Sequence, residues 1–110
     1  MGTLDKLCEA IQNRNAIHFT YNKPDKTPGV RIGNPHAVFI HMSKAGVRST
    51  KVHIAQTSGV SDSQKPFPSF RIFDVDDLTI QKVIEQGAPF SIHPDYNPNW
   101  EGYSEAISKV

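Results

Sequence analysis

The chain of 110 residues contains a single cysteine, Cys8. One cysteine cannot form an internal disulfide, and without a second cysteine nearby it does not provide the paired spacing found in zinc fingers. This residue usage is typical of a reducing compartment, so we expect a cytoplasmic protein.

Long apolar runs and an excess of one charge are also missing. The opening residues lack the apolar stretch of a secretory signal, and no later run approaches the length of a membrane span, so no membrane association is expected. The Met1-Gly2 start resembles a myristoylation signal, but Lys6 stands where Ser or Thr is required. With 12 Lys and Arg against 11 Asp and Glu, the net charge of +1 excludes strong whole-molecule attraction to nucleic acid. Any anion site must therefore arise from local placement of charge.

The sequence does contain segments of regular apolar spacing. Residues 1–15 have helical spacing, which predicts an amphipathic helix with Thr3 as its N-cap. Between residues 16 and 85, alternating runs separated by turns predict five strands, the last of which also fits a helix. Residues 86–110 predict a Pro-rich tail that ends in a short helix, with Tyr103, Ile107 and Val110 facing inward.

A chain of this length can bury one modest core, so residues 1–110 are expected to form a single domain. Five short strands that are mostly antiparallel neighbours, preceded by a helix, predict a mainly β fold. The sheet would be small and bent, or closed into a barrel, because closure removes exposed edges.

The fragments AIQNRNAIHFTYN, NPHAVF, VHIAQTSGVS, FRIFDVDDL and HPDYNPN follow one another in an order that resembles the WYL domain. That family is an Sm-like small barrel found in many bacterial regulators, and the resemblance covers most of the chain. It implies a module that senses ligands of nucleotide or nucleic-acid nature. The Trp-Tyr-Leu triad that names the family is absent around residues 51–54. The DNA-binding domain that usually precedes the family has no counterpart in residues 1–15.

Arg71 stands in the apolar segment PSFRIFDVDDL. Strand alternation places Phe70 on one face, and Arg71 and Phe73 on the other. A buried guanidinium without a partner costs several kcal/mol, so Arg71 must either line a ligand cavity or pair with a carboxylate such as Asp74 or Asp76. The resemblance matches residues 71–73 to the Arg-x-Phe of the family and implies that the arginine lines the ligand surface.

The predicted ligand-binding set comprises Arg71, Arg31, Lys51, His53, Gln56 and Phe73. The resemblance matches Arg31 to an arginine that follows the first strand and turn of the family. Arginine suits phosphate because it donates two hydrogen bonds at once, and His53 could add a pH-dependent charge. Lys51 and His53 share a strand face by alternation, which fits either a ligand surface or an ordinary solvated face. Gln56 begins a loop with serines and Gly59, which fits an anion-binding loop or a plain surface turn.

Motifs for catalysis or metal binding are missing. The five histidines do not form an H-E-x-x-H pattern, and no G-x-S-x-G segment is present, so we expect no metal, no cofactor and no enzymatic activity. Phe70 and Trp100 fit either a base-stacking surface or a core. The leading hypothesis is a non-enzymatic ligand-sensing module that binds a nucleotide or oligonucleotide on a cationic surface. The alternative is a protein-interaction or inhibitor module of a phage, mobile element or bacterial regulatory system, acting through a protein partner or as an oligomer.

Overall fold

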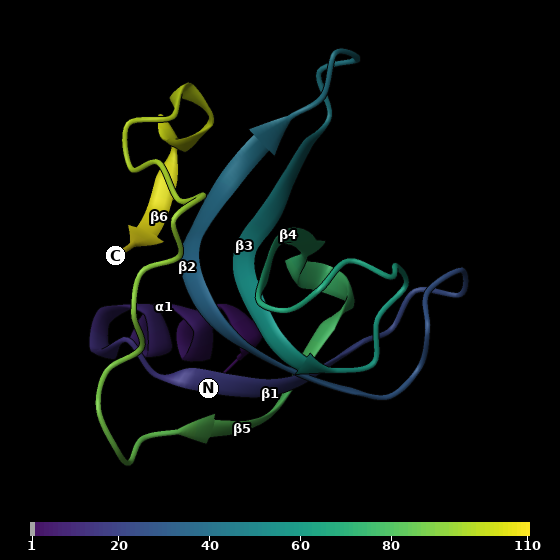
Figure 1. The fold of residues 1–110 in the computed structure, drawn as a ribbon. Helices are drawn as coiled ribbons and strands as arrows, with labels where there is room; N and C mark the ends of the chain where they lie inside the picture. Colours follow the sequence, from purple (N-terminus) through teal and green to yellow (C-terminus); the bar gives the residue numbers. More distant parts are fainter. Residues whose placement is uncertain (1) are drawn as a thin grey trace.

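The computed structural model describes residues 2–110, which fold into one α-helix, six strands and two 3-10 turns (Figure 1). The helix α1 spans Thr3–Asn13. The strands are β1 (Ala16–Tyr21), β2 (Val30–Met42), β3 (Arg48–Gly59), β4 (Ser69–Asp74), β5 (Leu78–Ile84) and β6 (Ala106–Lys109). The turns η1 and η2 span Val75–Asp77 and Glu101–Tyr103. The predicted mainly β class and the N-terminal helix are confirmed.

All six strands belong to one antiparallel sheet, in the order β4-β3-β2-β1-β5 with β6 paired to β2 beside that path. β3 runs along one edge of β2, from Arg31 to Met42. The other edge of β2 takes two partners in turn: β1 pairs with its first residues and β6 with Ala37–Phe39 (Figure 1). β6 therefore pairs with backbone groups of β2 that β1 does not reach, which satisfies their hydrogen bonds.

The predicted C-terminal helix is wrong, since η2 is a single 3-10 turn and the residues after it form β6. Tyr103 is buried and Val110 packs against the core, as predicted. Ile107 is 43% exposed instead of buried, because strand alternation in β6 turns it away from the sheet's covered side. The predicted five-stranded sheet thus has six strands, and within residues 2–110 the end strands β4 and β5 do not pair to close a barrel.

The helix α1 ends at Asn13 instead of residue 15, residue 1 of the prediction lies outside the described residues, and the first cap also differs. Gly2 is the N-cap, and the hydroxyl of Thr3 instead donates to the carbonyl of Leu78 at 3.4 Å. Arg14 ends the helix in the left-handed conformation (φ 52°), and its N–H bonds to the carbonyl of Ile11. In the part of the chain that the structure describes, no helix is long and apolar enough to cross a membrane.

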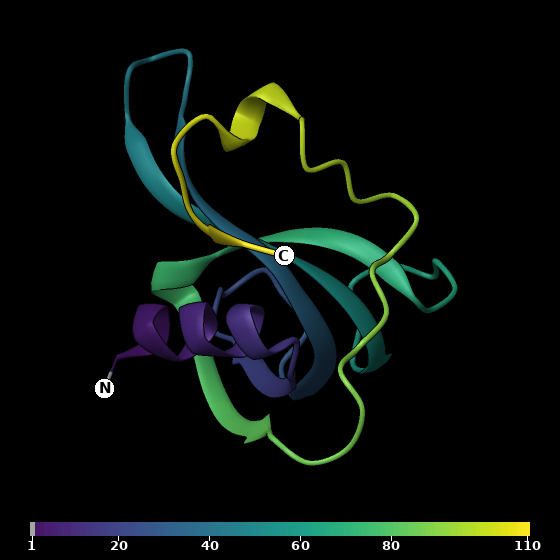
Figure 2. The same cartoon turned by 90° about the vertical axis from the view of Figure 1, so that its left-hand side faces the viewer.

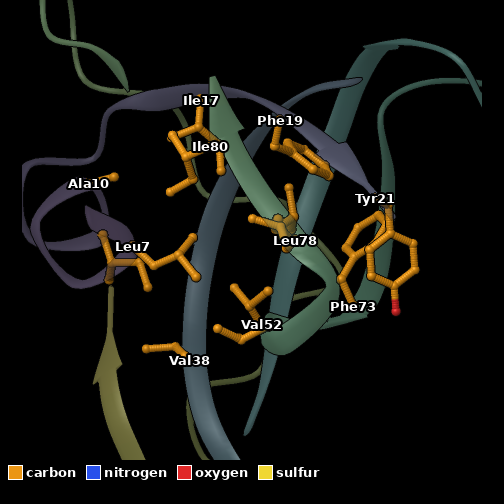
Figure 3. Packing of buried hydrophobic residues seen from close by; sticks show 13 residues of the cluster. Leu7, Ala10, Ile17, Phe19, Tyr21, Val38, Val52, Phe73, Leu78 and Ile80 are labelled. Atoms are coloured by element: carbon orange, nitrogen blue, oxygen red, sulfur yellow. The ribbon is translucent and has the colours of Figure 1, made fainter. Parts of the chain in front are cut away.

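The core fills the space between α1 and one face of the sheet, which we call the inner face (Figure 3). Alternate residues of β1, namely Ile17, Phe19 and Tyr21, point into it, which confirms the predicted alternation of that strand. Phe73 of β4 packs edge-to-face on Phe19 and Tyr21, with ring centroids 5.2 and 4.9 Å apart. Burial of these rings ties the end strand β4 to β1. The hydroxyl of Tyr21 adds a polar link, because it accepts the backbone N–H of Asp74 at 2.9 Å.

The outer face of β2, β3 and β4 is also apolar, and the segment between β5 and β6 passes over it. Figure 2 shows this segment leaving β5 and running past the sheet to η2. Its rings join those of the strands in what we call the outer aromatic cluster: His36, Phe39, His53, Phe70, Phe90, His93, Tyr96, Trp100 and Tyr103. Turns hold the segment in shape, for example the bond from the N–H of Trp100 to the carbonyl of Asn97.

Replacing Phe73 tests this packing. We expect Phe73→Ala to lower the free energy of unfolding by about 3–5 kcal/mol, because it leaves a cavity between Phe19 and Tyr21. The neighbouring Ile72 is 50% exposed and provides the control, with an expected loss of about 1 kcal/mol or less for Ile72→Ala. Urea denaturation measures both. Equal losses for the two variants would contradict the assignment of β4 faces.

Candidate functional site

A pocket of about 240 Å³ opens where β4 meets the two loops that follow β1 and β3. We call it the cationic pocket. Its charged and hydroxyl-bearing side chains are Lys26, Arg31, Asp62, Ser63, Lys65, Ser69 and Arg71, and the rings of Tyr21 and Phe73 form part of its wall. Four cationic groups thus surround a single carboxylate among the lining residues.

Arg31 is only 1% exposed, although it lies near the start of the long strand β2. One terminal nitrogen donates to a carboxylate oxygen of Asp62 at 2.8 Å and to the carbonyl of Thr27 at 3.3 Å. Its guanidinium lies 5.7 Å from the ring centre of Phe73 and 6.0 Å from that of Tyr21. Nε of Arg31 is buried and has no hydrogen-bond partner within residues 2–110, so the guanidinium still has an unused donor.

Asp62 anchors the loop after β3 to this arginine. Burial alone would raise the pKa of Asp62, but the N–H of Thr27 and the guanidinium of Arg31 outweigh it and hold the pKa well below the usual range. The carboxylate is therefore ionised throughout the neutral range. Its hydrogen bonds go to Arg31 and Thr27, and its charge also raises the pKa of Arg71, against the larger effects of burial and of Arg31.

Arg71 is held by hydroxyl groups. Its Nε donates to Ser69 at 2.6 Å and a terminal nitrogen donates to Ser63 at 3.1 Å, while the guanidinium lies 5.6 Å from the ring centre of Phe67. Burial and then repulsion from Arg31 lower the pKa of Arg71, but a guanidinium remains charged at neutral pH. Among the described residues no carboxylate lies within ion-pair distance of Arg71.

The carboxylates that were candidates to pair with Arg71 are engaged or placed elsewhere. Asp74 forms ion pairs with both Lys23 and Lys51 and accepts a hydrogen bond from the hydroxyl of Tyr21. Burial alone would raise the pKa of Asp74, but the two ammonium groups lower it below its ordinary value. The ion pair of Arg71 with a nearby carboxylate is thus absent from the described residues, and Arg71 lines the cationic pocket.

Gln56 does not line the pocket but supports it from beneath. The side chain is fully buried, and its amide donates to the carbonyls of Ser58 and Val60 at 3.1 and 2.7 Å. Gly59 follows with φ +95°, and a Cβ there would lie 2.4 Å from the carbonyl oxygen of Val30. The close approach that glycine permits is therefore to β2, where it fixes the backbone beside Arg31.

Three of the six predicted site residues come together in the pocket: Arg31, Arg71 and Phe73. Lys51 and His53 do share a face of β3, but it is the outer face, so neither lines the pocket. Lys51 pairs with Asp74, which stands directly opposite it in the β3–β4 register. The prediction missed Lys26, Asp62, Ser63 and Lys65, which come from loops where no periodicity indicates a direction.

His36 and His53 are titratable groups of the outer aromatic cluster. Nδ1 of His36 donates to the carbonyl of Asn34 at 2.8 Å, and its Nε2 accepts the backbone N–H of His93 at 2.9 Å. Both nitrogens are thus used by the neutral ring. Burial lowers the pKa of His36, against the opposing effect of the Asn34 carbonyl. Burial, with a smaller contribution from His36, lowers the pKa of His53 to about 4.

Within residues 2–110, no group of three or more His, Cys, Asp and Glu side chains is placed to hold a metal ion. The thiol of Cys8 has a raised pKa, owing first to burial and then to Asp5, which is unfavourable for a nucleophile.

No family model, no curated protein and no solved structure matches the chain.

The buried His36 and the half-buried His53 predict a pH dependence of stability. Their folded-state pKa values lie below the unfolded value of about 6.5, so below that pH the unfolded chain binds protons that the folded chain does not. The free energy of unfolding should fall on acidification by up to about 1.4 kcal/mol per pH unit for each histidine. Urea denaturation between pH 7.5 and 5 measures this.

His53→Asn removes one of the two contributions and should make the pH dependence shallower. His41 is exposed near the tip of the β2–β3 hairpin, and His41→Asn should leave the dependence unchanged. A free energy of unfolding that stays constant between pH 7.5 and 5 in the unmodified protein would contradict the neutral state of the buried rings.

Proposed function

We propose that this chain is a non-enzymatic ligand-binding module that holds a phosphate-bearing nucleotide or oligonucleotide in the cationic pocket. The observation that carries the proposal is the pairing of two arginines, Arg31 and Arg71, in a pocket whose single carboxylate is already engaged. An anion entering this space would relieve the repulsion between the two guanidinium groups and accept their unused donors.

The hydrogen-bond donors of the pocket are guanidinium and hydroxyl groups, which are suited to binding phosphate. Arg71 is held by neutral hydroxyl groups, which an oxyanion can replace at small cost because each is a weaker acceptor than a charged oxygen. Ser63 and Ser69 then remain available to donate to the same anion. Nε of Arg31 offers a further donor that the protein leaves unused within residues 2–110.

The size of the pocket favours recognition of phosphate over recognition of a whole ligand. Sites for small molecules commonly occupy about 300–1,000 Å³, and the cationic pocket has about 240 Å³. A phosphate or two would fill it and leave the sugar and base outside. An oligonucleotide backbone, or the phosphate end of a nucleotide, fits that requirement.

The arrangement of strands supports the same proposal. In the strand order β4-β3-β2-β1-β5, β5 returns beside β1 after the 3-10 turn η1, and we take this as an open relative of the small bent sheet that the resemblance implies. We infer a divergent WYL-like domain, in which Arg71 and Phe73 correspond to the Arg-x-Phe of that family. Arg31 and Arg71 are the two arginines that the resemblance matched to the family, and for Arg71 it implied a place on the ligand surface.

Arg71→Gln tests the site. We expect it to weaken binding of a nucleoside triphosphate by about 10- to 100-fold, because the charged hydrogen bonds of Arg71 are lost. Arg48→Gln is the matched control: it makes the same change in charge, at a surface residue paired with Glu105 outside the pocket. Isothermal titration calorimetry at fixed salt measures both, with inorganic pyrophosphate as competitor.

Two results would overturn the assignment. The first is equal affinity of the two variants for the nucleotide, which would show that any loss of affinity comes from the change in net charge alone. The second is no binding of nucleotide, oligonucleotide or pyrophosphate by the unmodified protein. Melting temperatures check folding, and both variants should stay close to the unmodified protein, because neither replaced residue belongs to the core.

A further inference from the structure

A second pocket, of about 250 Å³, opens on the outer face of the sheet. We call it the ring pocket. It is lined by His53, Phe70, Asp95, Asn97, Trp100 and Tyr103. These residues come from β3, β4 and the segment before β6, so the pocket exists only because that segment lies over the sheet. The ring pocket and the cationic pocket share Phe70 but have opposite chemistry.

The rings of this pocket are not parallel to one another, and their interplanar angles range from 40° for His53 and Phe70 to 90° for Trp100 and Tyr103. Trp100 and Tyr103 stand at 90° with centroids 5.1 Å apart, and His53 stands at 74° to Tyr103 and at 44° to Trp100. A flat nucleobase stacks best between parallel faces. Walls inclined to one another by 40° to 90° instead present ring faces from several directions, which suits a rounded group.

The charges of the lining point to a cation. Asp95 is the only acidic or basic residue besides His53 and Tyr103 among the six, and its side chain is 75% exposed, so it is accessible to a ligand, with Nδ1 of His93 3.9 Å from its carboxylate. His53 stays neutral near pH 7 because burial lowers its pKa to about 4. Tyr103 stays protonated because burial raises its pKa, and its hydroxyl is bonded to Nδ1 of His53 at 2.6 Å. The ring faces and the carboxylate are therefore the groups of the pocket that attract a cation, while the ammonium of Lys109 lies over the ring of Tyr103.

One of these rings, Tyr103, already contacts a cation of the protein itself. The ammonium of Lys109 lies 5.9 Å from the ring centre of Tyr103 and donates to the carbonyl of Pro98. Lys109 is not among the residues that line the pocket. Trp100, the strongest cation-binding ring of the set, is 40% exposed and has no cation near its face within residues 2–110.

We propose that the ring pocket binds a small organic cation that carries a quaternary methylammonium group, with Trp100, Tyr103 and Phe70 around the methyl groups and Asp95 beside the charge. Methylated ammonium is favoured over a bare one because it is weakly hydrated and makes apolar contact with every ring. This site does not depend on the proposed binding of phosphate in the cationic pocket.

The experiment uses Trp100 as its reporter, since it is the only tryptophan of the chain and lines the pocket. Its fluorescence is followed during titration with choline at constant ionic strength. We expect a saturable change with a dissociation constant in the millimolar range. The neutral isostere 3,3-dimethylbutan-1-ol, which replaces nitrogen by carbon, should bind at least about tenfold more weakly because the cation–ring attraction is lost.

Asp95→Asn should weaken choline binding about three- to tenfold, because it removes the charge beside the ammonium. Asp76→Asn is the control: it makes the same change at an exposed residue outside the pocket and should leave the affinity unchanged. For Trp100→Leu, where the reporter is lost, saturation-transfer NMR on the choline methyl signal should show no binding.

Three outcomes would overturn the proposal. Equal binding of the neutral isostere would show an apolar pocket without cation preference. Adenosine that displaces choline and binds more tightly would assign the pocket to a nucleobase. The third outcome is a Trp100 fluorescence that does not saturate below about 0.1 M choline, together with no saturation-transfer signal from the choline methyl groups.

Discussion

The sheet is apolar on both faces where β2, β3 and β4 run together, and the need to cover both faces is the constraint on which the rest of the structure depends. Val52 and Phe73 belong to the core beneath α1, whereas Phe39 and Phe70 belong to the outer aromatic cluster. Each exposed ring would cost roughly 25 cal/mol for every Å² of apolar surface left in water. Residues 2–110 form no second sheet that could lie there, so the segment after β5 returns over the outer face. Its pairing with β2 through β6 and the bond between His36 and His93 hold it in place.

Charge is nearly balanced over the whole chain but separated within it. At one end of β4, Asp74 is shared by Lys23 and Lys51, and in the loop after β3 Asp62 is bound to Arg31. These pairings use the nearby carboxylates and leave Arg71 with hydroxyl partners. An anion site thus arises without any excess of basic residues in the composition. On the other face of the same strand, the rings and Asp95 form a pocket of the opposite character, so β4 separates two electrostatic environments.

The alternation of residues along each strand predicted those features of the structure that depend only on local backbone geometry. Alternation placed Arg71 with Phe73 and opposite Phe70, and the structure has that arrangement. Alternation also placed Lys51 and His53 on the same face of β3, as in the structure. It cannot say which face of a strand is the inner one, because that depends on the register with β4 and on the segment over the outer face. Asp62 was missed because its contact with Arg31 joins residues 31 positions apart through an irregular loop. β6 was missed because four residues are too few to distinguish a strand from a helical turn.

The arginine in an apolar strand has a geometric explanation. Arg71 and Phe73 lie on the same face of β4, about 7 Å apart along the strand. Over that distance the inner face changes from the mouth of the cationic pocket to the buried core, where Phe73 is 4% exposed. A guanidinium at the mouth keeps contact with water and with Ser63 and Ser69, so it avoids most of the cost of burial. The same charge at position 73 would be enclosed by Phe19 and Tyr21 without an acceptor. The apolar pattern of β4 is therefore interrupted at the position where its inner face reaches solvent, and a ligand can approach it there.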